Sequence, residues 1–461
     1  MVSGYCIHVF LARNLSLEGY ADFGLAISIV SFLEMIMMQS FPMALRRKVS
    51  RNPETLPQSR TSALILTVTG SLVLTALVWV ATYLTDTFFN GSYHSGGIVR
   101  LASIDLIFFG IFSVFHAELN GRKLFKAQAL VTKIYSIARV SCIIAAVIID
   151  PSPQAALIAN IVSSVIGMAA GSLMAGWVRP VLSRTQIRKI TGFATPSFIS
   201  AGLQFFMINA DFWTLRLVAD ESASAIYYAA SNLARMIWLI RRIIASYFFP
   251  YISAAKSRSP ELAKASGDAA ISIVSIGLLF LAVIASDPGG IMEMMFGQQY
   301  RPGANILLIL SGALVFQSIY SILSTTLIAR STFTRLLITD TVCMTVLILM
   351  LFIMTKYLGA IGAALSLLAV HVLGTVVLWR FISRLTGERL VSIYLLLLSS
   401  LSAASAVFIA RILPLDGESI INTLIRCSTG GVLCSISMIL TGVISIGKLK
   451  RLLGLKKVSS S

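Results

Sequence analysis

Ionisable side chains that lie inside long apolar stretches are the residues of this chain with the clearest chemical potential. A charge in the hydrocarbon of a bilayer is costly, so such a residue usually binds a ligand, carries a proton or pairs with another charge. The candidates are His8, Glu34, Asp105, Lys133, Arg139, Asp211, Arg235, Arg241, Arg242, Asp340, His371 and Arg426. Their roles depend on the segments that hold them.

The strongest group lies in the apolar stretch 222–250. Asn232, Arg235 and Arg242 stand at i, i+3 and i+10, which places them on one face of a continuous helix. The guanidinium of Arg235, near the middle of the stretch, could hold a diphosphate in two-pronged fashion. We therefore predict a substrate-binding role for these three residues. The alternative is that the arginines snorkel to the membrane surface or form a structural salt bridge.

Four further basic residues extend this hypothesis. Arg139 lies near the middle of the stretch 124–149, with Lys133 nearer one end, and both are predicted to contact the substrate. Arg13 and Arg216 close the outer ends of two related segments, so we predict that they form a gate. Anchoring of these two arginines at the membrane interface is the alternative reading.

Three titratable residues are candidates for energy coupling. At an offset of 203 residues His8 aligns with Asp211, so two related helices carry a titratable group at the same level. Together with Asp105 they could bind the proton or sodium ion that drives a transport cycle. The alternative is a hydrogen bond that packs helices. No other cofactor is expected, and the sequence contains no phosphate-binding glycine loop, zinc-binding helix or nucleophile elbow.

The composition identifies the elements that must position these residues. Of the 461 residues 57% are apolar and 12% are charged, against about 25% charged in soluble domains. These values exclude a soluble enzyme, a disordered chain and a disulfide scaffold. The apolar runs are continuous rather than alternating, which excludes a β-barrel and predicts an all-α polytopic membrane protein. The predicted spans are 20–44, 62–84, 98–117, 124–149, 155–177, 191–217, 222–250, 268–286, 303–328, 334–355, 359–379, 390–410 and 421–446.

The short apolar segment 1–13 is expected to be an incomplete first span, which brings the count to about fourteen. If that span enters from the cytoplasm, the cytoplasmic loops and tail hold 25 Lys and Arg, whereas the opposite loops hold Arg301, Lys356 and Arg411. Basic loops stay inside, so both termini are predicted to be cytoplasmic. The same asymmetry accounts for the net charge of +18 without nucleic acid as a partner.

Comparison of the chain with itself shows an internal repeat. Phe41-Pro42 recurs as Phe249-Pro250 and Lys48 as Lys256, each at an offset of 208 residues. Six spans is an even number, so both copies enter the membrane in the same direction and form a parallel repeat. We therefore predict a six-helix N-terminal lobe (1–177), a basic linker (178–190), a six-helix C-terminal lobe (191–385), two additional helices (386–446) and a basic tail (447–461).

Several segments resemble the multidrug/oligosaccharidyl-lipid/polysaccharide exporter superfamily. They are Phe10–Arg13, Gly24–Ile29, Phe41-Pro42 with Arg46-Arg47, Tyr227–Ser231 with Pro250, Met295–Gly297 with Tyr300, and Gly359–Ala364. The resemblance is nearest to the O-antigen and exopolysaccharide repeat-unit flippases. It implies two lobes around a central cavity that opens alternately to either side. It also implies an undecaprenyl-diphosphate-linked oligosaccharide as cargo, a bacterial inner membrane as location and, as further partners, membrane lipids and a polysaccharide polymerase or export machinery.

Other functions remain open at this stage. A lipid II flippase or a cation-coupled multidrug exporter belongs to the same superfamily. A membrane glycan polymerase is an alternative from another class, but it should carry a large extracytoplasmic loop with catalytic carboxylates, and the longest such loop here, 286–302, is short. The sequence therefore predicts a transporter rather than an enzyme.

Overall fold

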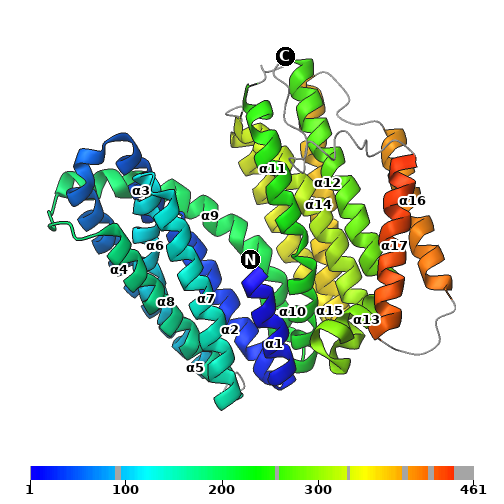
Figure 1. The fold of residues 1–461 in the computed structure, drawn as a ribbon, viewed down its shortest axis with the longest axis horizontal. Helices are drawn as coiled ribbons and strands as arrows, with labels where there is room; N and C mark the ends of the chain where they lie inside the picture. The colour runs from blue at the N-terminus through cyan, green and yellow to red at the C-terminus, as the bar shows by residue number, and fades with distance from the viewer. Residues whose placement is uncertain are drawn as a thin grey trace. The chain divides into compact units, whose positions relative to one another are not determined.

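The structure is a computed structural model that describes residues 2–88, 95–254, 259–329, 333–386, 393–413 and 420–440. Within these residues all the regular secondary structure is helical, as predicted (Figure 1). Nine of the described helices are long and apolar enough to cross a membrane. The chain is thus an all-α polytopic membrane protein, whereas the predicted count of fourteen spans is not confirmed. The predicted tail 447–461 lies outside the described residues.

Contacts between helices divide the chain into an N-terminal unit, Met1–Arg216, and a C-terminal unit, Leu217–Ser461. The predicted lobes instead meet at the linker 178–190, and those boundaries stay a prediction. The difference concerns the helix Arg184–Val218, which begins inside the predicted linker and has most of its length in the N-terminal unit.

The N-terminal unit is built from α1 (Val2–Asn14), α2 (Leu17–Met38), α3 (Phe41–Arg51), α4 (Leu56–Phe88), α5 (Gly96–Ser103), α6 (Asp105–Gly121), α7 (Phe125–Ile149), α8 (Pro153–Ala175) and α9 (Arg184–Val218). Helix α8 packs on α6 and α7, and α6 also packs on α3 and α4. Side-chain caps fix two of the helix starts: Ser16 accepts from the Gly19 amide at 3.0 Å and Ser152 from the Ala155 amide at 3.1 Å.

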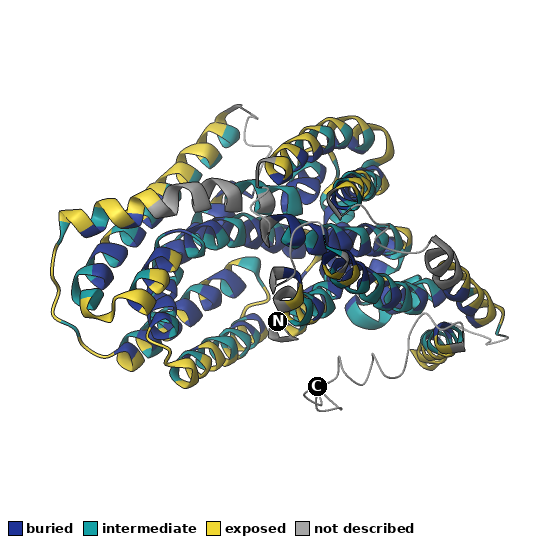
Figure 2. Cartoon of the chain, turned by 90° about the horizontal axis from the view of Figure 1, so that it is seen from above, coloured by how far each residue is buried: buried dark blue, intermediate teal, exposed yellow. Residues whose placement is uncertain are grey.

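The C-terminal unit contains α10 (Glu221–Ala234), α11 (Ile237–Ala254), α12 (Pro260–Ser286), α13 (Pro288–Phe296), α14 (Ala304–Ala329), α15 (Phe333–Thr386), α16 (Ile393–Ile412) and α17 (Ile420–Leu440). Helix α14 packs on α15 and α12, and α16 and α17 pack on each other and on α12. In Figure 2 the buried residues lie on the helix faces turned toward neighbouring helices, and exposed residues lie on the opposite faces.

Two departures from regular helix matter for function. The predicted span 222–250 is two helices, α10 and α11, joined by a turn at Arg235 and Met236. Helix α15 covers two predicted spans, 334–355 and 359–379, and a kink divides it at Gly359, whose backbone is non-helical with φ 56°. A left-handed φ is costly for residues with a Cβ, so glycine suits this junction.

Large apolar side chains remain exposed along several helices. On α4 they include Leu72, Val73, Leu77 and Val80, each more than half exposed. A soluble protein rarely leaves so continuous an apolar surface in water. These faces are therefore the lipid-facing surface of the protein.

Candidate functional site

Two carboxylates and a guanidinium meet inside the N-terminal unit. Asp105 begins α6 and is 1% exposed, and the Nδ2 of Asn160 in α8 donates to its carboxylate at 2.6 Å. Glu34 of α2 lies within hydrogen-bonding reach of Asp105, and Arg139 of α7 interacts electrostatically with both. We call Glu34, Asp105 and Arg139 the acidic cluster. Its net charge changes by one whenever one carboxylate gains or loses a proton.

Aromatic rings border this cluster. Tyr135, one turn before Arg139 on α7, lies within electrostatic reach of all three members. Its ring stacks on Phe112 of α6 with centroids 4.9 Å apart, and Phe109 lies 6.1 Å away. The rings exclude water and strengthen the electrostatic interactions of the charges beside them.

The structure separates the two predicted substrate-binding residues of α7. Arg139 is half-buried and lies against the carboxylates of the acidic cluster. Lys133 is exposed and lies more than a turn away. The positive charge of Arg139 is therefore shared with carboxylates of its own unit, and its predicted contact with substrate stays a prediction.

The predicted group around Arg235 has a different geometry from the one expected. The turn at Arg235 and Met236 interrupts the helix, so the spacing argument for one continuous face does not hold across it. Asn232 is buried and donates to the carbonyl oxygen of Tyr228, whereas Arg242 is exposed. The three residues thus lie in three different environments, and their role in binding stays a prediction.

Trp238 contacts two arginines at the turn and a neighbouring helix. The guanidinium carbons of Arg235 and Arg241 each lie 5.5 Å from its ring centroid, and the indole Nε1 donates to Oε1 of Gln317 in α14 at 2.7 Å. Cation–π contacts of this kind help to stabilise two positive charges that lie close together. Arg235 is half-buried. The C-terminal unit therefore holds two positive charges close together at the turn between α10 and α11.

The predicted gate residues also differ from each other. Arg216 is 7% exposed, and its Nη2 lies 2.7 Å from Oδ1 of Asp22 in α2 and 3.2 Å from Oγ of Ser95. Arg13 is exposed at the end of α1. The structure thus assigns Arg216 a tethering contact inside the N-terminal unit. The predicted gate stays a prediction.

The predicted coupling residues lie apart along the chain and in unlike surroundings. The His8 ring of α1 meets Tyr20 and Phe23 edge-on, with centroids 6.4 and 6.2 Å away. Asp211 of α9 is fully buried. Asp105, the third predicted coupling residue, lies beside the carboxylate of Glu34 and the guanidinium of Arg139.

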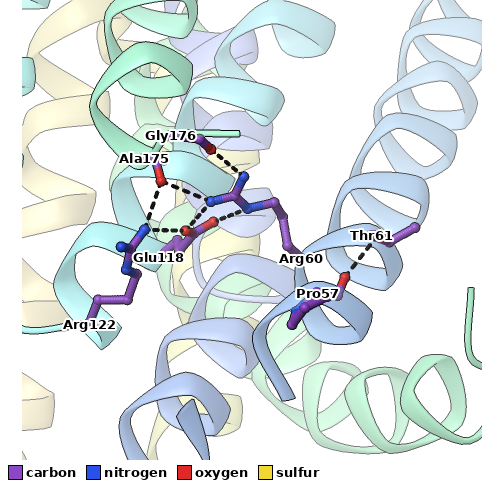
Figure 3. A network of polar contacts seen from close by, with 7 residues as sticks. All are labelled: Pro57, Arg60, Thr61, Glu118, Arg122, Ala175 and Gly176. Carbon is purple, nitrogen blue, oxygen red and sulfur yellow. Dashed lines mark hydrogen bonds and ion pairs between the residues drawn. The ribbon is translucent and has the colours of Figure 1, made fainter. Parts of the chain in front are cut away.

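Sequence reasoning missed a charged network at the basic end of the N-terminal unit (Figure 3). Arg60 of α4 donates through Nε to Glu118 of α6 at 2.6 Å, and Arg122 donates to the same carboxylate at 3.2 Å. The carbonyl oxygens of Ala175 and Gly176, at the end of α8, also accept hydrogen bonds from these guanidiniums. The sequence feature that could have indicated this network is Glu118, an acidic residue among basic residues at the ends of predicted spans.

The comparisons with known proteins agree with this architecture. The sequence profile described as "Polysaccharide biosynthesis protein" matches residues 2–256, more than half of the chain. The chain belongs to this family of polysaccharide biosynthesis proteins. Comparison with curated protein sequences gives no match.

Solved structures show the same fold. The lipid II flippase MurJ in an inward closed conformation has a TM-score of 0.81 at 16% identity, over 95% of this chain and 96% of that one. A multidrug resistance MATE family transporter of the MOP superfamily, inward-facing, has a TM-score of 0.71 at 16% identity, over 83% and 95%. This family member therefore has the fold of these solved transporters and flippases.

Proposed function

We propose that this protein flips an undecaprenyl-diphosphate-linked oligosaccharide from the cytoplasmic to the periplasmic leaflet of a bacterial inner membrane. The family match over residues 2–256 carries the proposal, because that family is described by polysaccharide biosynthesis. The fold supports it, since MurJ is described as a flippase of a lipid. Both termini are proposed to be cytoplasmic, and the cargo to be an O-antigen or exopolysaccharide repeat unit that a polymerase then uses.

The cargo carries a diphosphate, so a site that binds it needs positive charge. Arg235 fits because its surroundings include a second arginine and an aromatic ring at a helix break. A guanidinium can hold two phosphate oxygens at once. We therefore propose Arg235 as the principal diphosphate contact, with Asn232, Arg242, Arg139 and Lys133 as further cargo contacts.

Movement of the cargo needs an energy source. We propose that the acidic cluster binds the coupling ion, a proton or sodium, and that Arg139 adjusts the affinity of Glu34 and Asp105 for it. The net charge of a carboxyl pair beside one guanidinium changes by one each time an ion binds or leaves. Such a change can shift the equilibrium between two conformations of the protein. His8 and Asp211 are proposed as further coupling residues, and Arg13 and Arg216 as gate residues.

Two other functions make different predictions. A lipid II flippase has specific support from the MurJ likeness, which extends over 95% of this chain. A cation-coupled multidrug exporter has support from the MATE likeness over 83%. Cargo chemistry separates the three, because a drug exporter moves a compound without a diphosphate.

A transport assay with three cargoes tests the proposal. The purified chain is reconstituted in proteoliposomes with a polyprenyl-diphosphate oligosaccharide, lipid II or a fluorescent cationic drug, under an imposed proton or sodium gradient. We expect the oligosaccharide to cross fastest, and to cross only with a gradient. Faster movement of lipid II or of the drug would support the corresponding alternative, and equal leakage from protein-free vesicles would exclude transport of that cargo.

A further inference from the structure

A basic pocket lies in the N-terminal unit where the end of α3 meets the start of α9. Its volume is about 230 Å³, and it is separate from the acidic cluster and from the Arg60–Glu118 network. Seven residues line it: Ala44, Arg47, Lys48, Arg51, Asn52, Lys189 and Ile190. Four of the seven are cations and none is acidic.

The helical spacing of α3 builds one wall of this pocket. Ala44, Lys48 and Arg51 follow one another at i, i+4 and i+7, which places them on one face of the helix. Ala44 and Ile190 are 5% and 1% exposed and belong to a packed apolar cluster. The floor is therefore apolar and rigid, while the charges stand at the rim.

The rim holds like charges together. Lys48 is half-buried, and Lys189, from the second turn of α9, lies close enough for the two charges to repel each other. Arg51 is exposed beside them. The fold holds these cations around one pocket, although moving them apart would lower their electrostatic energy. A bound anion would remove that repulsion.

We propose that this pocket binds the phosphate group of an anionic membrane lipid. Residues 47–51 form the end of the candidate span Leu17–Arg51, and the loops on that side carry most of the basic residues of the sequence. A phosphate anchored to a lipid lies at this level of a membrane, and nearby Lys and Arg side chains favour its binding. The proposal does not depend on the identity of the transported cargo.

A titration of the full-length purified chain tests it. Short-chain phosphatidylglycerol is added to the detergent-solubilised protein, with phosphatidylcholine as the zwitterionic probe, and binding is followed by native mass spectrometry. The variant Lys48→Gln/Lys189→Gln removes two rim charges. We expect its affinity for phosphatidylglycerol to fall by about tenfold or more, with no change in the weak binding of phosphatidylcholine.

Two matched variants complete the design. Lys123→Gln/Lys126→Gln removes two exposed lysines outside the pocket, one from the α6–α7 connection and one from the first turn of α7, and it should bind phosphatidylglycerol like the wild type. Lys48→Arg/Lys189→Arg keeps the charge and should restore binding if the glutamine variant folds poorly. Unchanged binding by the glutamine variant of the pocket, or an equal loss in the α6–α7 variant, would overturn the proposal.

The source of the phosphate is tested in the same experiment. Inorganic phosphate and pyrophosphate are added as competitors of phosphatidylglycerol. If millimolar phosphate or pyrophosphate leaves lipid binding intact, the lipid anchor is part of recognition, as proposed. Complete displacement by free phosphate or pyrophosphate would show a site for the soluble anion and would overturn the assignment to a membrane lipid.

Discussion

The guanidinium of Arg60 and the carboxylate of Glu118 form a two-pronged ion pair between α4 and α6, with Arg60 7% and Glu118 0% exposed. The same guanidinium donates to the carbonyl oxygens that end α8. The last carbonyls of a helix have no partner within the helix and carry partial negative charge. One arginine therefore joins three helices at one end of the N-terminal unit.

The first prediction concerns this pair. Glu118→Ala should destabilise the protein by about 3–5 kcal/mol, because it leaves two guanidiniums near buried carbonyls without their carboxylate. Thermal unfolding of the purified variant in detergent measures the loss. Glu54→Ala, which removes an exposed carboxylate from η1 (Pro53–Thr55), is the control and should change stability little. Equal stabilities of the two variants would contradict a structural role for Glu118.

The second prediction concerns the acidic cluster. Asp105→Asn should abolish gradient-driven transport but preserve exchange of cargo at equilibrium, because the cluster loses one ion-binding group while the scaffold stays packed. The assay is transport in proteoliposomes with and without a gradient. Asp150→Asn, at an exposed carboxylate beyond α7, is the matched control and should behave like the wild type. Gradient-driven transport by Asp105→Asn would remove this residue from the coupling mechanism.

The third prediction concerns Arg235. Arg235→Ala should lower transport of a diphosphate-linked cargo by at least about tenfold without lowering the amount of protein in the membrane. Arg235→Lys should retain part of the activity, since lysine keeps the charge but lacks the planar fork. Lys264→Ala, at an exposed lysine of α12, controls for the loss of a positive charge from the same unit. Normal transport by Arg235→Ala would exclude this arginine as the diphosphate contact.

The fourth prediction separates a tether from a gate at Arg216. If its contact with Asp22 is a tether, Arg216→Ala and Asp22→Ala should each reduce stability, and the double variant should lose less than their sum by about 0.5–3 kcal/mol. The free energies of unfolding of the wild type, the two single variants and the double variant complete this double-mutant cycle. A change in transport rate at unchanged stability would instead support the predicted gate, and Arg13→Ala should then have the same effect.

Much of the fold was predictable from hydropathy. Most of the long apolar runs lie within described helices, because a membrane helix must satisfy its own backbone hydrogen bonds over about 20 residues. The break at Arg235 was not predictable, since no proline or glycine marks it. The composition of residues 222–250 suits one continuous helix, so the sequence gives no reason to expect a turn within them.

The site was harder to predict than the fold. Asp105 was identified because a carboxylate inside an apolar segment is unusual, and Glu34 was noticed for the same reason. Their proximity to Arg139 depends on how α2, α6 and α7 pack, which no spacing in the sequence encodes. Glu118 escaped attention because it stands at the end of a predicted span, where a carboxylate in water would be ordinary.

The junction at Gly359 has a consequence for biosynthesis. The chain reverses so sharply there that a Cβ on Gly362 would collide with the carbonyl oxygen of Met354, and no long loop separates the two arms of α15. A junction this short keeps the two arms next to each other from the moment they are made. It therefore favours insertion of both arms as one helical hairpin, with Lys356 close to its tip.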